Sequence, residues 1–417
     1  MRRDRIHIVG GGIIGLCAAW YLNSEGCEVT IIDENDISDG TSFGNAGMIV
    51  PSHFVPMAAP GVISQGLKWM LNSKSPFYIK PRMNADLIQW LWYFFRSSNS
   101  IHVTKSAPVL YRLNEESKWL YKSMQEQNGF NFGLDERGLL MLYKTTKQAN
   151  EEEELAIKAH RMGVEAHILD SKALQELEPE MDYNVKGGIY FPGDAHLCPN
   201  LLMKQLCNQL RKSGVKFLCH SKIVDFEIKN ETINSLILDD QTAFSVENVL
   251  LTSGSWTGLL LKKIGIKIHL QDGKGYSITS NEPEFCPRIP TILSEAKVAI
   301  TPMDNHLRVG GTLELSGLSE KINKHRVKGI LDSIPDYYNN LKINMDDHTK
   351  VWRGFRPCTP DGLPYIGKSD KLNNLYVGTG HGMMGLSLGA VTGKLLSEII
   401  TDQKPMLSVQ PFRMGRF

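Results

Sequence analysis

The stretch Ile6-His7-Ile8-Val9-Gly10-Gly11-Gly12-Ile13-Ile14-Gly15 decides the fold that we expect for this chain. Its first four residues have the length of a buried parallel strand, and the pattern G-x-G-x-x-G follows directly. A helix is expected over residues 13–24, closed by Gly26, and a second strand over residues 29–32. Strand, glycine turn, helix and strand in this order predict a βαβ unit that binds a dinucleotide.

Each glycine of this pattern has a physical role in such a unit. Gly10 makes the tight turn, Gly12 has no Cβ and lets the main chain approach a pyrophosphate, and Gly15 lets helix and strand pack closely. The helix that opens at Ile13 and Ile14 offers free N–H groups and a partial positive charge to the phosphates. The alternative is a glycine turn in an α/β domain that binds nothing.

The end of the second strand supplies the expected ribose ligand. Asp33 directly follows the apolar run, and its carboxylate can accept hydrogen bonds from ribose hydroxyls. Glu34 is the alternative ligand.

A second glycine-rich turn near the other end of the chain favours a flavin over a nicotinamide. The run Gly378-Thr379-Gly380-His381-Gly382-Met383-Met384-Gly385 follows a short strand and opens a helix that we expect over residues 384–400. A nicotinamide enzyme needs one such turn per cofactor, whereas a second helix N-terminus would stabilise the negative charge that appears on a reduced flavin ring. The alternative is a loop whose glycines serve packing alone.

The composition is that of an ordinary globular protein, with 42% hydrophobic and 22% charged residues and a formal net charge of +1. This balance argues against a nucleic-acid partner. Seven scattered cysteines without a CxxC pair are expected to be reduced thiols. Since neither a secretory signal nor a membrane-spanning stretch is visible, we expect a cytoplasmic protein. No metal-binding spacing of His and Cys occurs, so no metal is expected.

The aromatic stretch 87–95 has two interpretations. We favour a core or interdomain helix. The alternative is a peripheral membrane contact on the inner face of the cytoplasmic membrane, because Trp and Tyr suit a membrane interface.

Four stretches together resemble the D-amino-acid oxidase/dehydrogenase superfamily of FAD-dependent oxidoreductases, most closely bacterial D-amino-acid dehydrogenase. They are Ile8 to Gly15 with Asp33, Thr41 to Gly47, Gly254-Ser255-Trp256, and Arg356 to Gly367 running into the 378–385 turn. The resemblance implies an α/β fold, in which a Rossmann-like FAD-binding domain of the glutathione-reductase type is interwoven with a mixed-sheet α+β substrate domain. We expect residues 1–60, 196–265 and 352–402 in the first domain, and residues 61–195 and 266–351 in the second.

The coarse pattern of elements between these motifs is also predictable. Residues 63–128, with Trp69 among their aromatics, are expected to be largely helical. Further helices are expected over 151–162, 200–213 and near 321–334, and strands over 138–143, 215–218, 222–228, 233–238 and 246–252.

The resemblance also implies which residues contact FAD. Thr41, Ser42, Asn45, Ala46 and Gly47 are expected to line the pyrophosphate and the flavin. The main chain of Val224 should contact the adenine, and Gly254 and Trp256 should close over the cofactor. The turn with Gly380, Gly382, Met383, Met384 and Gly385 should face the flavin carbonyl edge.

The implied reaction is oxidative deamination of a D-amino acid. A hydride leaves Cα for flavin N5, and the imino acid is hydrolysed to a 2-oxo acid. Arg356 is the first candidate for binding the substrate carboxylate, since a bidentate arginine suits it, and Arg353 is the second. The alternative for Arg356 is a structural arginine that binds loop carbonyls.

Four further residues are weaker catalytic candidates. Tyr276 could hydrogen-bond the substrate, and Lys274 could lie near the flavin as a lysine does in sarcosine oxidase. His53 and His381 could line the pocket, although a lone histidine is more often a hydrogen-bonded bystander.

Pro302 stands where the better-known D-amino-acid dehydrogenases are expected to have an arginine. The missing cation suggests another substrate, such as D-proline or a hydroxy-D-proline. The electron acceptor is expected to be a quinone, another carrier or oxygen. The alternatives are a glycine- or sarcosine-type amine oxidase, a tRNA-modifying FAD module of the same fold, and a non-catalytic flavin-binding subunit.

Overall fold

The computed structural model describes residues 4–417 except 65, 67–75, 81–83, 282, 344 and 346–348. The expected βαβ unit is present as β1 (Arg5–Val9), α1 (Ile13–Ser24) and β2 (Glu28–Ile32). Gly26 follows the helix with φ +86°, the left-handed conformation expected of a glycine that ends a helix. The predicted α/β class is confirmed.

The first sheet of the described chain has six strands in the order β19-β20-β13-β1-β2-β9. The partners of β1 and β2 are β9 (Lys216–Leu218), β13 (Asn248–Leu251), β19 (Tyr365–Lys368) and β20 (Leu375–Thr379). All neighbours pair in parallel except β19 with β20. Because the chain leaves β1 to one side and returns on its other side at β13, the carboxyl end of β1 is a topological switch point, where such sheets bind ligands.

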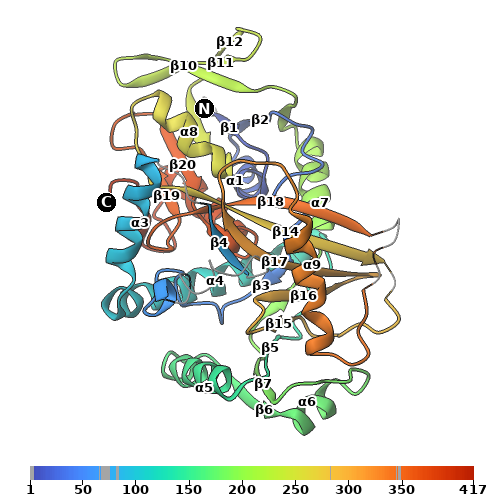
Figure 1. The fold of residues 1–417 in the computed structure, drawn as a ribbon. Coiled ribbons are helices and arrows are strands. Elements are labelled where there is room, and N and C mark those ends of the chain that lie inside the picture. Colours follow the sequence, from blue (N-terminus) through green and yellow to red (C-terminus); the bar gives the residue numbers. More distant parts are fainter. Residues whose placement is uncertain are drawn as a thin grey trace.

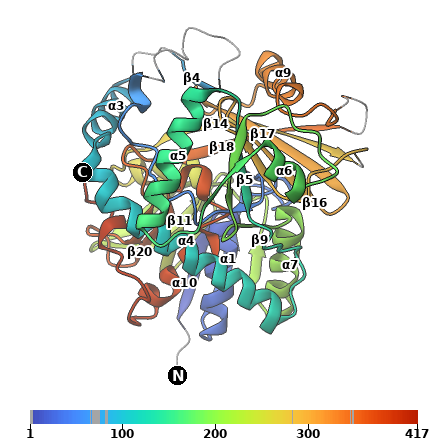
Figure 2. The same cartoon turned by 90° about the horizontal axis from the view of Figure 1, so that it is seen from below.

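Helices cover one face of this sheet in a single apolar cluster, and Figure 2 shows α1, α4 and α10 close together. They include α4 (Ser100–Asn128), α7 (Pro199–Lys212) and α10 (Gly389–Ile400). The last helix begins at Gly389 and not at Met384 as expected, because a 3-10 turn over Gly382–Met384 comes first. A Cβ on Gly393 would lie 2.5 Å from the main chain of Cys17, so α10 can approach α1 this closely only at a glycine.

The second sheet has nine strands in the described chain, in the order β18-β14-β17-β16-β15-β5-β7-β6 with β4 beside β17. Its strands are β4 (Phe77–Ile79), β5 (Leu139–Tyr143), β6 (His167–Asp170), β7 (Gly187–Phe191), β14 (Gln271–Asn281), β15 (Thr291–Leu293), β16 (Val298–Met303), β17 (His306–Leu315) and β18 (Lys350–Cys358). In Figure 1 this sheet lies below and to the right of the first.

The remaining elements are peripheral or connect the two sheets. They are β3 (Met48–Ile49), β8 (Ala195–His196), the meander β10 (Ile223–Lys229), β11 (Thr232–Leu238) and β12 (Ala243–Ser245), and the helices α3 (Ala85–Ser97), α5 (Thr146–Arg161), α6 (Ser171–Leu177), α8 (Thr257–Lys263) and α9 (Lys324–Asp332). Short 3-10 turns occur at Gly254–Trp256, Ile334–Asp336 and Gln410–Phe412. The expected helical region 63–128 also contains the strand β4, and Trp69 lies outside the described residues.

Two expected domain boundaries do not agree with the structure. The boundary at residue 352 cuts through β18, which pairs with β14 along its whole length from Lys350 to Cys358. Helix α4 was expected in the substrate domain, but its Leu113 and Tyr121 pack in the same cluster as α1 and α10. Strand β18 continues across residue 352 because both of its ends pair with β14. Helix α4 belongs with the first domain because its apolar face packs against α10. The rest of the division remains a proposal.

All seven cysteines are free thiols in the structure, as predicted. In the described residues, no helix combines the length and the apolar character that crossing a membrane requires.

Candidate functional site

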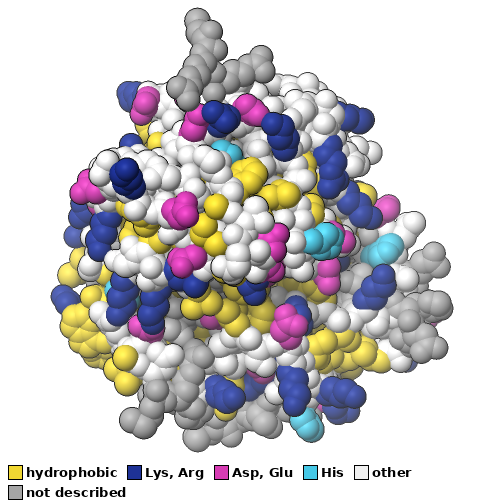
Figure 3. Space-filling model, turned by 90° about the horizontal axis from the view of Figure 1, so that it is seen from above, with side chains coloured by type: hydrophobic (Ala, Val, Ile, Leu, Met, Phe, Trp, Pro, Cys, Tyr) yellow, Lys and Arg dark blue, Asp and Glu magenta, His cyan; other side chains and the backbone are white. Residues whose placement is uncertain are grey.

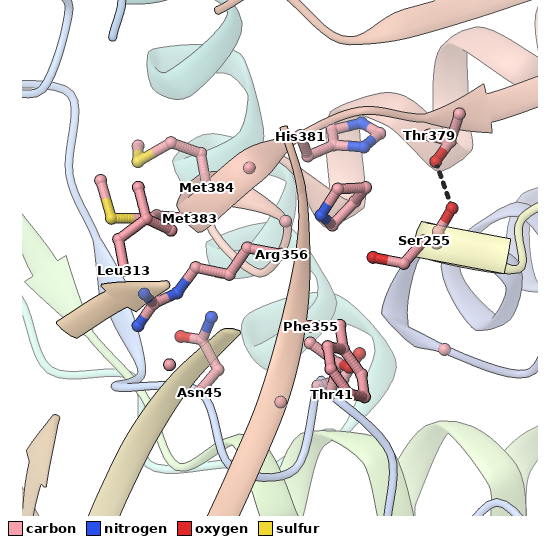
Figure 4. A pocket seen from close by; sticks show the side chains of 18 of the residues that line it. Thr41, Asn45, Ser255, Leu313, Phe355, Arg356, Thr379, His381, Met383 and Met384 are labelled. Carbon is pink, nitrogen blue, oxygen red and sulfur yellow. Dashed lines mark hydrogen bonds between the residues drawn. The ribbon is translucent and has the colours of Figure 1, made fainter. Parts of the chain in front are cut away.

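A cavity of about 1700 Å³ lies between the two sheets at the carboxyl end of β1. One end is lined by Lys222 and Val224 of the β9–β10 region, and the other by His53 and Met141. Small-molecule pockets have volumes of roughly 300–1,000 Å³, so this one has room for a dinucleotide and a substrate together. Figure 4 shows its central part, with side chains contributed by both domains.

The first glycine turn combines two tightly packed glycines with one that faces open space. A Cβ on Gly10 (φ +108°) would lie 2.8 Å from the main chain of Ser253, and one on Gly15 only 2.1 Å from the carbonyl oxygen of Gly10. A Cβ on Gly12 would meet only Ser42 Oγ, at 3.5 Å. Gly10 and Gly15 are therefore needed for close packing, and Gly12 keeps the cavity wall open to a ligand. Gly10, Gly12, Ile13 and Ile14 line the cavity, and Gly15 supports the turn from behind.

Both acidic candidates at the end of β2 border the cavity. Asp33 Oδ2 accepts a hydrogen bond from Gly11 N at 2.7 Å, and its Oδ1 accepts one from Asn35 N at 2.8 Å. Glu34 lies 3.8 Å from Lys222 Nζ. The carboxylate of Asp33 is fixed against the glycine turn and retains lone pairs for a ribose hydroxyl, so we keep it as the first choice.

Val224, Gly254 and Trp256, which we predicted to contact the cofactor, all line the cavity. The ladder between β10 and β11 is irregular between Ile223 and Asp225, so Val224 sits in a bulge that leaves its main chain outside regular pairing. Gly254 and Trp256 also line the cavity, and the Trp256 ring meets the Phe355 ring edge-on at 5.7 Å. This geometry is compatible with the expected contacts.

The second glycine turn borders the cavity through Gly382, Met383, Met384 and Gly385. Gly380 does not line it. Its φ is +83°, and a Cβ there would lie 2.6 Å from Thr359 Cγ2, so this glycine serves the turn itself. Thr379 Oγ1 donates a hydrogen bond to Gly254 O at 2.8 Å, which joins this turn to the strand end beside it (Figure 4).

His381 contributes to the cavity wall, but its ring is engaged elsewhere. Its Nε2 lies 3.0 Å from Thr392 Oγ1 on α10, and burial lowers the pKa of this imidazole to about 3. A neutral ring held in this way is a structural group, and we do not retain it as a catalytic residue.

Arg356 of β18 lies beside the cavity with its guanidinium across Gly275 of the neighbouring strand. A Cβ on Gly275 would lie 2.4 Å from Arg356 Cζ, so a larger residue there would require the guanidinium to shift from this position. Arg356 Nη1 donates to the Thr312 carbonyl, and Figure 4 shows the group reaching toward Leu313 and Asn45. Burial lowers the pKa of Arg356, but an arginine remains charged at neutral pH.

Arg353 also lines the cavity, but it forms an ion pair with Glu320. Its Nη2 lies 3.1 Å from Glu320 Oε2. Arg356 therefore remains the better candidate for binding a carboxylate.

Two sequence-based candidates turn away from the cavity. Lys274 Nζ donates to the carbonyls of Ser319 and Lys321 and lies 3.4 Å from Glu314 Oε2. Tyr276 contributes to the wall, but its hydroxyl donates to Glu314 Oε2 at 3.0 Å. Since both polar groups are bound to Glu314, they form a buried ionic cluster, and the catalytic prediction for them is not supported by this geometry.

His53 does face the cavity. Its Nδ1 lies 3.1 Å from Ser52 Oγ, and burial together with nearby Lys297 lowers the pKa of the imidazole to about 4. Lys297 is an exposed residue at the cavity edge that we did not predict, because a lysine in a short turn carries no distinctive pattern.

A family model described as "FAD dependent oxidoreductase" matches residues 5–399. The chain belongs to this family. The D-amino acid dehydrogenase of Granulibacter bethesdensis is 30% identical over 421 residues, covering 99% of both proteins. That of Helicobacter pylori is 31% identical over 404 residues, covering 96% of this chain and 95% of the relative. Glycine oxidase from Geobacillus kaustophilus superposes with a TM-score of 0.78 at 21% identity over 99% of each chain, which shows the shared fold.

This FAD-dependent oxidoreductase has a cavity that fits its cofactor. Beyond the open wall at Gly12, the hydroxyls of Ser255 and Ser277 are buried in the cavity lining without a partner among the described residues. Orphaned polar groups of this kind are expected where a polar ligand binds. The first turn and Ser42 would hold the phosphates, and the second turn would face the ring.

The loop over residues 41–47 is held by an arginine from the other domain, which we did not predict. Arg308 of β17 is buried, and its Nη1 donates to the carbonyls of Phe43 and Asn45 at 2.7 and 2.8 Å. Ser42 Oγ in turn accepts from Ile13 N at 3.0 Å, which caps α1. Arg308 is a strand residue in an ordinary pattern, so no local signal could have revealed it.

Within this loop the predicted residues divide into two groups. Thr41, Ser42, Asn45 and Ala46 line the cavity. Gly47 does not, because it lies behind the wall with φ +77°, and a Cβ there would be 2.3 Å from Leu197 O. Gly47 therefore serves packing, and this position does not support the predicted contact with the cofactor.

We expect Arg308→Met to weaken FAD binding at least about tenfold, because hydrogen bonds to a charged group contribute roughly 1.5–3 kcal/mol each. The dissociation constant of FAD, measured by flavin fluorescence on the apoprotein, checks this. Arg288→Met is the matched control, since Arg288 pairs with Glu180 on the surface. Equal affinities for the two variants would contradict the assigned role.

Proposed function

We propose that this protein catalyses the FAD-dependent dehydrogenation of a D-amino acid to the imino acid, which water then hydrolyses to a 2-oxo acid. The observation that carries the proposal is Arg356, a half-buried cation at the cavity wall whose guanidinium lies across Gly275. The two curated relatives named D-amino acid dehydrogenase, at 30% and 31% identity over nearly the full length, support the same reaction.

Arg356 is proposed to bind and orient the substrate carboxylate. One guanidinium nitrogen is fixed to the Thr312 carbonyl, so the remaining N–H groups can present a planar pair of donors to a carboxylate. Orientation matters because Cα must lie against the ring of FAD, which supplies the two-electron acceptor when bound.

Apart from Arg356, His53 and Lys297, the substrate end is largely apolar. The apolar side chains in its wall are Val50, Val55, Met141, Ile292, Ala299 and Leu313. Pro302, at the place where an arginine was expected, lies in β16 paired with Leu307 and is not among the residues that line the cavity, so the inference rests on the apolar wall. We infer an apolar or cyclic side chain for the substrate, with D-proline or a hydroxy-D-proline as the leading examples.

Anaerobic mixing of the FAD-loaded protein with single amino acids tests the reaction. We expect D-proline, hydroxy-D-proline and apolar D-amino acids to bleach the flavin absorbance, and their L-isomers, glycine and sarcosine to do so at least tenfold more slowly. Repeating the assay in air and with a soluble quinone distinguishes a dehydrogenase from an oxidase. Bleaching only by glycine or sarcosine, or only by L-isomers, would overturn the proposal.

Arg356→Ala is expected to raise KM by about two orders of magnitude or more, because a shielded charge-assisted pair is lost. Arg353→Ala serves as the control, since Arg353 is already paired with Glu320, and its KM should change less than about threefold. Steady-state kinetics with the best substrate of the panel provide both values. An unchanged KM for Arg356→Ala would remove it from the site.

A peripheral membrane contact is proposed for the outer face of α3. Leu87 and Trp90 pack inward, as the core interpretation requires, and Trp90 Nε1 donates to Cys358 O at 2.9 Å. Ile88, Trp92 and Phe95 recur along the opposite face with exposures of 60%, 50% and 68%. Arg96 covers the Trp92 ring at 4.8 Å, and an apolar stripe with such a cation suits an anionic lipid surface that holds a quinone.

The charged side chains drawn on the face in Figure 3 do not form a continuous basic track. On the face in Figure 3, lysines and arginines alternate with acidic side chains among the described residues. This mixture gives no support to the tRNA alternative.

Replacing both Trp92 and Phe95 by Glu is expected to reduce sedimentation with phosphatidylglycerol vesicles at least about tenfold, because burying one aromatic side chain contributes roughly 1.5–3 kcal/mol. Ile157→Glu on α5 is the control, since Ile157 is also exposed but lies apart from this stripe. Equal binding of both variants and the parent would exclude the membrane contact.

A further inference from the structure

Three side chains form a hydrogen-bonded row from the cavity wall into the protein. His53 Nδ1 lies 3.1 Å from Ser52 Oγ, and Ser52 Oγ donates to Asp194 Oδ2 at 2.5 Å. Ser52 and His53 belong to the loop after β3, whereas Asp194 lies in the turn between β7 and β8, 142 residues further along the chain. Because Nδ1 faces Ser52, Nε2 is the ring nitrogen available to a substrate in the cavity.

The two ends of this row have very different surroundings. His53 borders the cavity, whereas Asp194 is only 1% exposed. Burial raises the pKa of the Asp194 carboxyl to about 7, although its bonds to Ser52 and the nearby Lys118 act in the opposite direction. A carboxylate with this pKa can take up a proton near neutral pH, which an ordinary aspartate cannot do.

The proposed reaction requires a proton to leave the substrate before the hydride does. A free amino acid carries an ammonium group, and its nitrogen must have a lone pair to form the C=N bond as the Cα–H bond breaks. One proton is therefore released for each hydride transferred. Arg356 cannot accept it, because a guanidinium is already fully protonated.

We propose that His53, Ser52 and Asp194 form a proton relay that takes this proton from the substrate ammonium, an inference that rests on the proposed function. His53 Nε2 accepts the ammonium proton, His53 Nδ1 passes its own proton to Ser52 Oγ, and Ser52 passes its hydroxyl proton to Asp194 Oδ2. One N–H bond of the substrate is broken and one O–H bond is formed on Asp194, with no change in oxidation state. Loss of that proton to solvent resets the row.

The charged and titratable groups around the row set its pH dependence. Lys118 and Glu115 of α4 act on Asp194, whose charge in turn raises the pKa of Tyr111 on the same helix, and Lys297 of the β15–β16 turn acts on His53. Asp194 must be ionised to accept a proton, so the relay works above pH 7 and fails as the pH falls through the raised pKa of the acid.

A purely structural row would behave differently. Asp194 Oδ1 also accepts a hydrogen bond from Ser52 N at 2.9 Å, so the carboxylate shapes this loop whether or not protons move. Loss of that shaping would lower the rate equally at every pH. Loss of a relay would lower the rate only while the substrate arrives as an ammonium ion. The difference in rate from the parent would disappear at a pH where the free amine predominates.

The rate constant of flavin reduction at saturating substrate, measured by stopped flow from pH 6 to 10.5, tests the relay. In the parent protein it should rise with pH through an apparent pKa near 7. Asp194→Asn and Ser52→Ala should lower it at least tenfold at pH 7.5, remove that pKa, and approach the parent rate at the highest pH. Ser52→Thr, which keeps a hydroxyl, should retain most of the rate.

Ser387→Ala is the matched control. Ser387 Oγ also binds this segment, accepting from Val50 N at 3.1 Å, but it donates to Asn114 and not to the row. It should retain the pH profile of the parent. Parent-like rates for Ser52→Ala and Asp194→Asn at pH 7.5, or a loss of equal size at pH 7.5 and 10.5, would overturn the relay.

A second measurement needs no substrate and separates this inference from the proposed function. The infrared spectrum of the parent minus that of Asp194→Asn should show a protonated carboxyl band that disappears between pH 6 and 8 and shifts in Ser52→Ala. Absence of that band at pH 6 would overturn the relay even if D-amino acids reduce the flavin. Failure of every amino acid to reduce the flavin would instead overturn the proposed function and, with it, the relay.

Discussion

The rest of the molecule depends on the close packing of main-chain segments at the carboxyl end of β1. Gly10 lies against the end of β13, and Gly15 lies against the carbonyl of Gly10, each without space for a single methyl group. This packing brings the N-terminus of α1 to the switch point of the sheet, where its free N–H groups meet the cavity. The cofactor site is a consequence of that backbone fit.

The two domains complete one another at the same cavity. Arg308 extends from the second sheet to hold the loop of the first, and Trp352 of β18 donates to Asp39 Oδ1 at 3.1 Å while its ring covers Gly44. β18 then continues toward the second glycine turn, which it meets at the bridge between Cys358 and His381. Neither sheet alone would form the walls that enclose FAD and the substrate.

Much of the first domain could be predicted because local patterns determine it. The strand, the glycine turn and α1 follow from apolar runs and glycine spacing, and the turn at residues 382–385 borders the cavity. Lys274 and Tyr276 could not be placed, because their direction depends on strand alternation and on a pairing irregularity between them. Gly47 and Gly380 show that a glycine beside a site can serve packing alone, and Arg308 depends on contacts between distant segments that no local pattern encodes.

The division of the cavity wall has a consequence for how such enzymes diversify. The apolar residues at the substrate end come from the loop after β3 and from β5, β15, β16 and β17, whereas the two glycine turns belong to the other sheet. Exchanges among Val55, Met141 and Ile292 can thus reshape the chamber for the amine without disturbing the nucleotide. Selection can therefore redirect this scaffold to new nitrogen compounds while its redox machinery stays intact.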